Sequence, residues 1–246
     1  MFKKVLIGAL IFIVILMGAI LVVQYTLSDE MPEGIEGPEA EELTDLMFDA
    51  VGKSAWDSTA FAMWSFRGAH HYLWNKEAHL VRVKWDEFTV YLHPDTKDGK
   101  AFVFESELSG EDKTEKINTA WDYFNNDSFW LIAPLKARDP GTSREYVETD
   151  RGPALKVSYS SGGTTPGDTY LWHLSESGIP ESWQMWVQII PIGGMEFTWE
   201  NWVATRTGVM VALDHKAEGG IEVPISGVDF AMTLEDLNVR DSLIVK

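Results

Sequence analysis

The apolar positions of the chain change their spacing near residue 52. From Ala40 to Val51 they recur at steps of three and four residues, as on one face of an α-helix, and Gly52 follows where a helix would end. Beyond that point apolar and polar side chains alternate, which is typical of half-buried β-strands. The sequence therefore predicts one amphipathic helix over residues 39–51 and a mainly β remainder.

The clearest alternation lies between His79 and His93 and predicts a hairpin. Its register matters because His79 directly opposite His93 would suggest a metal site. Pairing Val81 with Leu92 instead brings the apolar faces of both strands together around a tight turn at residues 86–87. We therefore expect this second register, no His79/His93 ligand pair and no metal site.

Similar alternation between turn-forming segments predicts about ten or eleven strands, mostly antiparallel. Besides the hairpin, they are expected at residues 61–67, 100–105, 154–159, 168–174, 182–190, 195–203, 208–213 and 228–234. The expected fold class is mainly β (α+β). It is a strongly curved antiparallel sheet, or half-barrel, closed by one or two helices and preceded by one N-terminal transmembrane helix.

One helix is expected to interrupt the strands. It begins at Ser109, a capping-type residue, and carries Trp121 and Phe124 on its apolar face. Asn readily takes the left-handed conformation that ends a helix, so we predict a stop at the "NND" sequence of residues 125–127. Extended chain would follow up to Pro134. In this prediction the two halves fold back as a lid, and Trp121 and Trp130 face one cavity.

Residues 5–23 form the longest apolar run of the chain, with no polar side chain. Nineteen helical residues at about 1.5 Å each are just long enough to span a hydrocarbon core of roughly 30 Å. Lys3 and Lys4 precede the run, so the positive-inside rule keeps the N-terminus in the cytoplasm. A cleaved signal peptide is the alternative, but its apolar region is usually only about 7–15 residues long.

This pattern predicts three parts in the chain. Residues 1–27 form an uncleaved, single-pass anchor in the cell membrane, and residues 28–38, rich in acid, Pro and Gly, form a solvated acidic linker. Residues 39–246 form one domain on the extracytoplasmic side of the membrane, which is the periplasm in a cell with two membranes.

Charge and composition exclude several functions. Beyond the anchor, 18 basic side chains stand against 38 acidic ones, a net charge of about −20 that repels nucleic acid and anionic lipid headgroups. The chain has no cysteine, which removes disulfides, thiol nucleophiles and thiolate metal sites. It also lacks a glycine-rich phosphate loop, Gly-x-Ser-x-Gly and His-Glu-x-x-His. We predict no cofactor, no nucleic-acid partner and no catalytic residues.

Two acidic residues offer an alternative chemistry. Glu196 and Glu200 alternate with Thr198 on one predicted strand face, which is similar to the acid-rich strand of concanavalin-like retaining glycosidases. Those enzymes carry an Asp between the two glutamates, where this chain has Thr198. A solvated strand face accounts for the same pattern.

Two further clusters carry potential chemistry. His70 and His71 are neighbours near a predicted strand end, so they should point to opposite faces, and a surface pair is favoured over shared ligands. Lys136, Arg138 and Arg144 gather in a predicted loop of an otherwise acidic chain. Such a cluster could hold a carboxylate or phosphate, or it could be a chance grouping.

The chain holds eleven tryptophans, many for its length. A core could contain them, and so could a cavity with apolar, adaptable walls. Seven aromatic side chains lie on apolar strand or helix faces, or on the predicted loop at the rim, and are our candidates for lining a hydrophobic cup: Trp64, Phe66, Trp74, Trp85, Trp121, Phe124 and Trp130.

Three strings, "MWSFRGAHHYLWNKEAHLVRVKW", "NNDSFWLIAPLKARDPG" and "GGTTPGDTYLWHL", resemble a bacterial family related to the LolA/LolB-like lipoprotein carrier superfamily. The likeness covers residues 45–240. It implies an incomplete β-barrel closed by helices, with an apolar cup that binds acyl chains of lipoproteins or other lipids. Carriers of that kind are released as soluble proteins, whereas this chain is predicted to be tethered.

The favoured function is therefore a membrane-anchored, extracytoplasmic binding protein, not an enzyme. Its partner would be a lipid or a lipidated protein, held in the aromatic-lined cup. Two alternatives stay open. One is a carbohydrate-binding or carbohydrate-active β protein that uses Glu196 and Glu200, and the other is an envelope scaffold without a small ligand.

Overall fold

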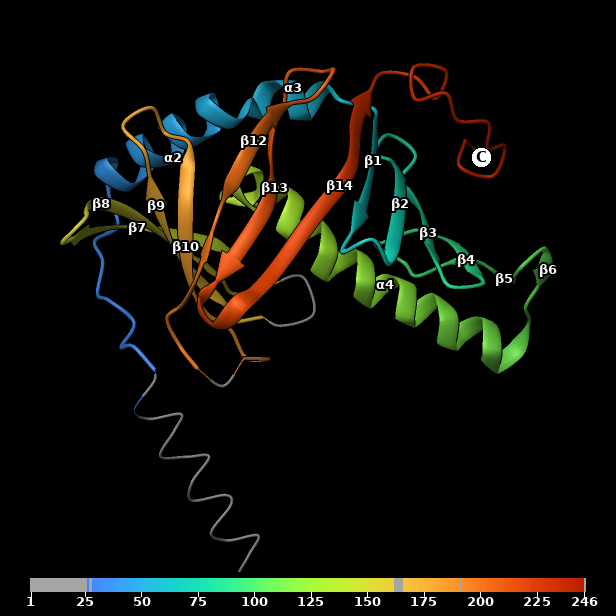
Figure 1. Ribbon diagram of the computed structural model, residues 1–246, viewed down its shortest axis with the longest axis horizontal. Coiled ribbons are helices and arrows are strands. Elements are labelled where there is room, and N and C mark those ends of the chain that lie inside the picture. Colours follow the sequence, from blue (N-terminus) through green and yellow to red (C-terminus); the bar gives the residue numbers. More distant parts are fainter. Residues whose placement is uncertain (1–25, 27, 162–165, 191, 246) are drawn as a thin grey trace, which may run out of the picture.

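Figure 1 shows the computed structural model, which describes residue 26 and residues 28–161, 166–190 and 192–245. Within these ranges the chain forms three α-helices and fourteen strands, joined by two short 3₁₀ turns, η1 (Ala133–Lys136) and η2 (Glu218–Gly220). The predicted anchor lies outside the described residues. No helix of the described part is long and apolar enough to cross a membrane.

The strands form two open, antiparallel sheets. The nine-stranded sheet has the order β12-β13-β14-β1-β2-β3-β4-β5-β6, and the five-stranded sheet has the order β11-β10-β9-β8-β7. Strands of the larger sheet are β1 (Phe61–Phe66), β2 (His70–Asn75), β3 (Leu80–Trp85), β4 (Phe88–Leu92), β5 (Gly99–Val103), β6 (Ser106–Glu107), β12 (Glu200–Ala204), β13 (Met210–Ala217) and β14 (Ile221–Ala231). Strands of the smaller sheet are β7 (Thr142–Thr149), β8 (Gly152–Tyr159), β9 (Thr169–Leu174), β10 (Pro180–Trp186) and β11 (Met195–Thr198).

The mainly β class and the curved antiparallel sheets are as expected, but the predicted single sheet of ten or eleven strands is wrong. One predicted strand, residues 195–203, is divided at Trp199 into β11 and β12, which belong to different sheets. The backbone N–H of Trp199 donates to the carbonyl of Glu181, 2.7 Å away. This bond holds Trp199 beside β10, and the chain passes from the smaller sheet to the larger one at this residue.

The first predicted helix is confirmed as α2 (Pro38–Val51), followed by α3 (Lys53–Ser58). Gly52 ends α2 in the left-handed conformation, with φ of 76°. A Cβ atom there would also lie 2.9 Å from the carbonyl oxygen of Gly208, so both conformation and space favour glycine. The buried face of α2 packs against the smaller sheet and β13.

The hairpin register is confirmed. β3 and β4 pair with Val81 opposite Leu92 and Trp85 opposite Phe88, around a turn at residues 86–87 in which Asp86 has φ of 43°. The rings of His79 and His93 still stack beyond the paired residues, with centroids 5.8 Å apart. The apolar pattern therefore determined which faces meet.

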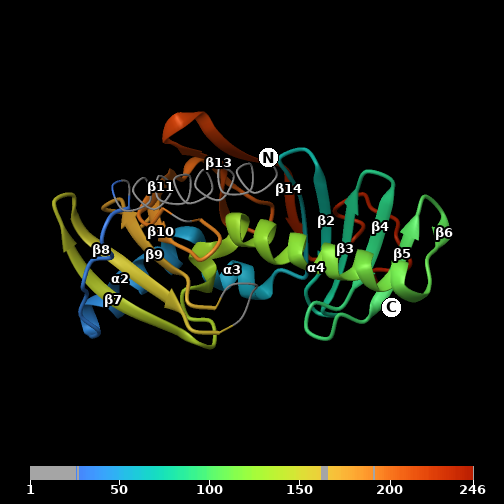
Figure 2. The same cartoon turned by 90° about the horizontal axis from the view of Figure 1, so that it is seen from below.

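The second predicted helix continues further than expected. α4 (Gly110–Ile132) begins where Ser109 indicated, but it runs through the "NND" sequence without a break. Asn125 donates to the backbone carbonyl of Trp121 within the helix, and Asp127 is bonded to β2. The local bond of Asn125 and the tertiary contact of Asp127 together override the weak helix propensity of the three residues. Figure 2 shows α4 lying across strands of both sheets.

The predicted acidic linker is not a free tether. Residues 28–37, here called the N-terminal strap, cross the outer face of the smaller sheet. Ile35 pairs with Tyr146 on the edge strand β7 through two backbone hydrogen bonds of 2.8 and 2.9 Å. The buried ammonium group of Lys156 donates to the carbonyl of Pro32, 3.0 Å away. The strap thus covers part of an otherwise free strand edge.

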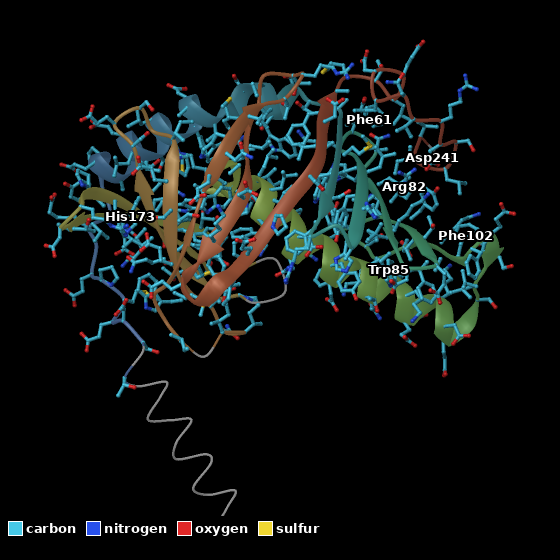
Figure 3. The ribbon with its side chains drawn as sticks, in the orientation of Figure 1. Phe61, Arg82, Trp85, Phe102, His173 and Asp241 are labelled. Atoms are coloured by element: carbon cyan, nitrogen blue, oxygen red, sulfur yellow. The ribbon has the colours of Figure 1, made fainter. Side chains whose placement is uncertain are left out.

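The C-terminal segment covers the outer face of the larger sheet. Asp241, nearly buried, accepts hydrogen bonds from Arg82 at 2.7 Å and from the hydroxyl of Tyr91 at 2.8 Å. Asn75 donates to the carbonyl of Ile244 at 2.9 Å. Figure 3 shows Arg82 near Asp241 on one side of the sheet and Trp85 on the α4 side.

We expect Asp241→Ala to destabilise the protein by about 3 kcal/mol, because the substitution leaves the largely buried guanidinium of Arg82 without its charge partner. The midpoint of denaturant unfolding measures this loss. Asp57→Ala is the control, since Asp57 forms an exposed ion pair with Lys53 and its removal should change the midpoint little. Equal effects of the two substitutions would show that the buried pair does not hold the C-terminal segment.

Candidate functional site

A layer of aromatic side chains lies between α4 and the two sheets. Past the midpoint of α4, Phe124 contacts the rings of Trp64, Tyr72 and Trp74, with centroid distances of 6.2, 6.3 and 5.2 Å. Trp64 and Tyr72 themselves stack at 4.5 Å. The two strands that carry them, β1 and β2, are neighbours, so their inward faces form a continuous aromatic surface under the helix.

Closer to the end of α4, Phe129 and Trp130 pack mainly on the smaller sheet and β13. Phe129 stacks on Trp183 at 5.7 Å. Trp130 meets Trp183 at 5.1 Å, Phe197 at 4.9 Å and His215 at 5.4 Å. One helix thus brings both sheets into a common aromatic layer.

The structure brings some of the seven predicted cup residues together and separates others. Four are buried in the layer beneath α4: Trp64, Phe66, Trp85 and Phe124. Trp74 packs between Trp56 and Phe124. That any of them binds a ligand stays a prediction.

Trp121 and Trp130 do not face one cavity, so the lid prediction is wrong. Both lie on the same continuous helix, nine residues apart, which is about two and a half turns and places them on opposite sides. The indole of Trp121 donates to the carbonyl of Pro94 at 2.7 Å, and the ammonium of Lys97 lies 3.5 Å from its ring centroid. Only Trp130 belongs to the aromatic layer near the smaller sheet.

Sequence reasoning missed several members of the layer. They are Tyr72, Tyr123, Phe129, Tyr170, Trp172, Trp183, Trp199 and His215. The signal was present in the alternation of apolar residues on the predicted strands at 168–174 and 182–190, whose inward faces carry three of these rings. The order of strands, which the sequence does not reveal, brings these rings under the same helix.

Several buried polar atoms in this layer have no hydrogen-bond partner among the described residues. They are the indole N–H groups of Trp64, Trp172, Trp183 and Trp199. Native structures rarely leave such groups unpaired, and each costs about 1–3 kcal/mol when buried alone. The side chains packed under the C-terminal end of α4 are therefore mainly apolar, but several of their indole N–H groups make no hydrogen bond to the described residues.

His215 lies at the centre of this region and is fully buried. Its ring meets Trp199 edge to face at 4.3 Å. Burial lowers the pKa of His215 to about 4, although backbone groups of Thr198 and Trp130 and the charge of Asp214 act in the opposite direction. The imidazole is therefore neutral at pH 7.

Asp127 forms a polar connection between α4 and β2, five residues before the helix ends at Ile132. This carboxylate is buried and accepts hydrogen bonds from Tyr72 at 2.5 Å and from His70 at 2.7 Å. Burial and then the neighbouring charge of Asp127 raise the pKa of Tyr72, so its hydroxyl stays protonated and donates. His70 also stacks on Tyr123 at 3.9 Å. The group fixes the position of α4 on β2.

The two adjacent histidines point to opposite faces, as expected. His71 is exposed and bonds the hydroxyl of Ser65 at 2.7 Å, whereas His70 turns inward to Asp127. The predicted surface pair is therefore wrong for His70. An Asp–His pair can orient a catalytic base, but the hydroxyl of Ser65 lies with His71 on the other face of the sheet, so this arrangement brings no serine nucleophile to His70.

The two glutamates do not form a glycosidase-like pair. Glu196 accepts hydrogen bonds from Arg151, at 2.7 Å, and from Ser182, and these outweigh burial and lower its pKa. A hydrogen bond from Lys216 at 2.9 Å lowers the pKa of Glu200. A general acid needs a raised pKa, so this geometry gives the carbohydrate-active alternative no support.

The basic cluster is an internal clamp. Glu41 of α2 accepts from Arg144 at 2.6 Å and from Arg138 at 2.7 Å, and Arg138 also bonds Asp45 at 2.5 Å. Lys136 pairs with Asp139. Because Lys136, Arg138 and Arg144 each have a carboxylate partner, the geometry does not support an anion site, which was one of the two alternatives for this cluster.

Two of the surface cavities formed by the described residues lie at the ends of the aromatic layer's supporting elements, α4 and the β7–β8 pair. One of about 240 Å³ lies between the start of α4 and residues 97–99, and the other, of about 320 Å³, lies at one end of β7 and β8. The larger is lined by Gly141, Thr142, Ser143, Ser158, Tyr159, Ser160 and Gly167. The ring of Tyr159 contacts Phe129 at 5.4 Å, so this hydroxyl-rich cavity adjoins the aromatic layer.

Comparisons with known proteins find similar solved structures, of which two are described here. No family model matches the sequence, and no curated protein matches it. A DUF1329 family protein from Desulfovibrio piger shares 13% sequence identity at a TM-score of 0.44, over 85% of this chain and 98% of that one. A "putative outer membrane lipoprotein-sorting protein domain" from Vibrio parahaemolyticus shares 9% at a TM-score of 0.36, over 84% and 100%.

The description of the second of these proteins names lipoprotein sorting, the role of the carriers that the sequence strings resemble. At such TM-scores the likeness carries no argument about what this chain binds, and that argument depends on the site itself.

We expect stability to depend on pH through His215. Between the ordinary histidine pKa of about 6.5 and its folded value, the unfolded chain binds a proton that the folded protein excludes. The free energy of unfolding should therefore fall by about 3 kcal/mol as the pH falls from about 6.5 to 4. Chemical denaturation at several pH values measures this slope.

In the same measurement His215→Phe should remove most of the slope while keeping a ring in the layer. His79→Gln, a change at an exposed histidine, is the control and should keep the slope. His173, whose pKa burial also lowers, supplies part of any slope that remains. A His215→Phe variant with the full slope would contradict the assignment.

Proposed function

We propose that the chain is a membrane-anchored, extracytoplasmic protein that binds an acyl-chain ligand between α4 and the sheets, and that it is not an enzyme. The proposal joins the apolar N-terminal run to the aromatic layer of the domain. The ligand class is a lipid or a lipidated protein, whose chain would lie against aromatic rings.

The observation that carries the proposal is the chemistry under the second half of α4. Trp183, Trp199 and Trp172 form a mutually contacting cluster with centroid distances of 4.9–5.1 Å, and their indole N–H groups have no partner among the described residues. A purely structural core would favour donors that are satisfied or absent. A ligand with both an apolar chain and a carbonyl group fits such a surface, because its ester or amide oxygen would accept from these indoles.

The larger cavity supplies a route consistent with this ligand. Its lining includes Ser158 and Ser160, whose hydroxyls bond Thr169 and the carbonyl of Gly141, and the ring of Tyr159 separates the cavity from Phe129 in the layer. The hydroxyl of Tyr159 is buried without a partner among the described residues. Moving this ring and the nearby end of α4 would join the cavity to the tryptophan cluster.

Binding can be tested with N-palmitoylglycine methyl ester, which carries an acyl chain and two carbonyl groups. Native mass spectrometry of the full-length protein released from detergent micelles gives its dissociation constant. Trp183→Phe and Trp199→Phe keep an aromatic ring but remove the donors. Since one hydrogen bond contributes about 1 kcal/mol, each change should weaken binding roughly fivefold.

Trp121→Phe is the matched control for this titration. The indole of Trp121 already donates to Pro94 and lies on the opposite side of α4, so its replacement should leave the dissociation constant unchanged. A wild-type protein that binds no probe would contradict the proposed function and favour a scaffold without a small ligand. Equal affinities for all variants would exclude the indoles as ligand donors.

A further inference from the structure

The first residues of the N-terminal strap are held at the β10–β11 connection. The backbone N–H of Asp29 donates to the carbonyl of Gly193 at 2.9 Å, and the N–H of Gly193 donates to the hydroxyl of Ser28 at 3.1 Å. The indole of Trp186 donates to the carbonyl of Asp29, also at 2.9 Å. Three hydrogen bonds thus fix the point at which the chain enters the domain.

The sequence at this connection is suited to that contact. A Cβ atom on Gly193 would lie 2.6 Å from the ring of Trp186, and one on Gly194 would lie 2.6 Å from the Cβ of Asp29. Gly194 also has φ of 80°, which disfavours other residues. The two glycines therefore allow the strap to approach closely.

This fixed point places the connection near the end of the predicted anchor. Only residues 24–27 separate Val23, the last residue of the apolar run, from Ser28. Five residue steps of fully extended chain cover at most about 17 Å. If the run spans a bilayer, the β10–β11 connection must lie within that distance of the end of the span.

The connection also presents apolar surface there. Ile189 has 67% of its surface exposed, and Trp186 is half-buried beside the strap. The base of the connection is ordered by a hydrogen bond from the N–H of Gln188 to Asp168 at 3.0 Å and by one from Ile190 to Val187 at 3.2 Å. The exposure of Ile189 is therefore held by the fold.

We propose that Trp186 and Ile189 form a membrane-contact surface that rests on a bilayer beside the anchor. The inference depends on the proposed anchoring and adds a second, side-chain contact to it. Tryptophan is enriched at the membrane–water interface, and an isoleucine gains free energy by entering the acyl region. The acidic charge of the domain, including Asp29 and Glu30, selects zwitterionic over anionic headgroups.

The membrane contact would orient the candidate binding site relative to the bilayer. The side chain of Gln188 donates to the carbonyl of Pro166, next to Gly167 at the rim of the larger cavity. The cavity therefore opens close to the membrane-contact surface. An acyl chain leaving the bilayer would have a short path to the aromatic layer.

Depth-dependent fluorescence quenching tests the contact. The chain has no cysteine, so a single introduced cysteine can carry one NBD label on the full-length protein in phosphatidylcholine nanodiscs. Spin-labelled phosphatidylcholine should quench a label at Ile189→Cys several-fold more than one at Phe104→Cys. Phe104 is also highly exposed, but it lies between β5 and β6, at the far end of the domain from the strap (Figure 1).

A label at Ala19→Cys, within the apolar run, separates the possible failures. Strong quenching at position 19 with position 189 no more quenched than 104 would overturn the membrane contact while leaving the anchor intact. Absence of quenching at position 19 would overturn the anchor and the contact with it. The palmitoylglycine ester titration is independent of both labels, so ligand binding stands or fails separately.

The substitution itself should be harmless, and a second variant checks this. Ile189→Ser removes the apolar side chain without a label and should leave the denaturant midpoint unchanged because the residue is exposed. With a label at Gln188→Cys, Ile189→Ser should reduce quenching by the spin-labelled lipid. Unchanged quenching in this pair would also overturn the role of Ile189.

Discussion

The packing of α4 across both sheets is the interaction on which the rest of the structure depends. α4 leads from β6, the outer strand of the larger sheet, to η1 and then β7, the outer strand of the smaller sheet. Its apolar side chains enter the aromatic layer from one side, while β1, β2, β10 and β13 supply rings from the other. Burying each large ring contributes about 2–3 kcal/mol, so the layer is a principal source of the free energy that holds the sheets together.

The buried carboxylate of Asp127 gives this packing a defined position. An apolar interface alone would tolerate small shifts of a helix along a sheet, whereas a buried charge requires specific partners. Tyr72 and His70 supply hydrogen bonds from adjacent inward positions of β2. A displacement of α4 by one turn would leave the carboxylate unpaired, at a cost that exceeds what most apolar contacts could regain.

The sequence predicted those elements whose signals are local. The β3–β4 register followed from matching apolar faces, and the end of α2 followed from Gly52, because each depends on residues close together in the chain. The course of α4 past the "NND" sequence could not be predicted in this way. The tertiary partners of Asp127, His70 and Tyr72, lie more than fifty residues away in the sequence.

The absence of β7 from the predicted strands has a similar cause. β7 carries polar residues on both of its faces. Its side chains contact α2, where Arg144 pairs with Glu41, and the N-terminal strap. Its sequence therefore lacks the apolar period that identifies a strand facing a core. The sequence likewise identified only some residues of the candidate site. Trp64 and Phe124 lie on clear apolar faces, but the assembly of Trp172, Trp183 and Trp199 around His215 depends on the order of strands.

The parts of α4 before and after Asp127 differ in how readily they could admit a ligand. The longer part, residues 110–127, ends at the carboxylate whose hydrogen bonds to β2 would all break if that part of the helix moved away. The last five residues, 128–132, carry Phe129 and Trp130 against Trp183, whose indole N–H has no partner among the described residues in the closed arrangement. A ligand with an acyl chain and carbonyl acceptors would replace part of the ring packing that opening disrupts, and it would also satisfy this donor. Opening of this last segment, with Asp127 as the fixed point, therefore requires less free energy than release of the whole helix.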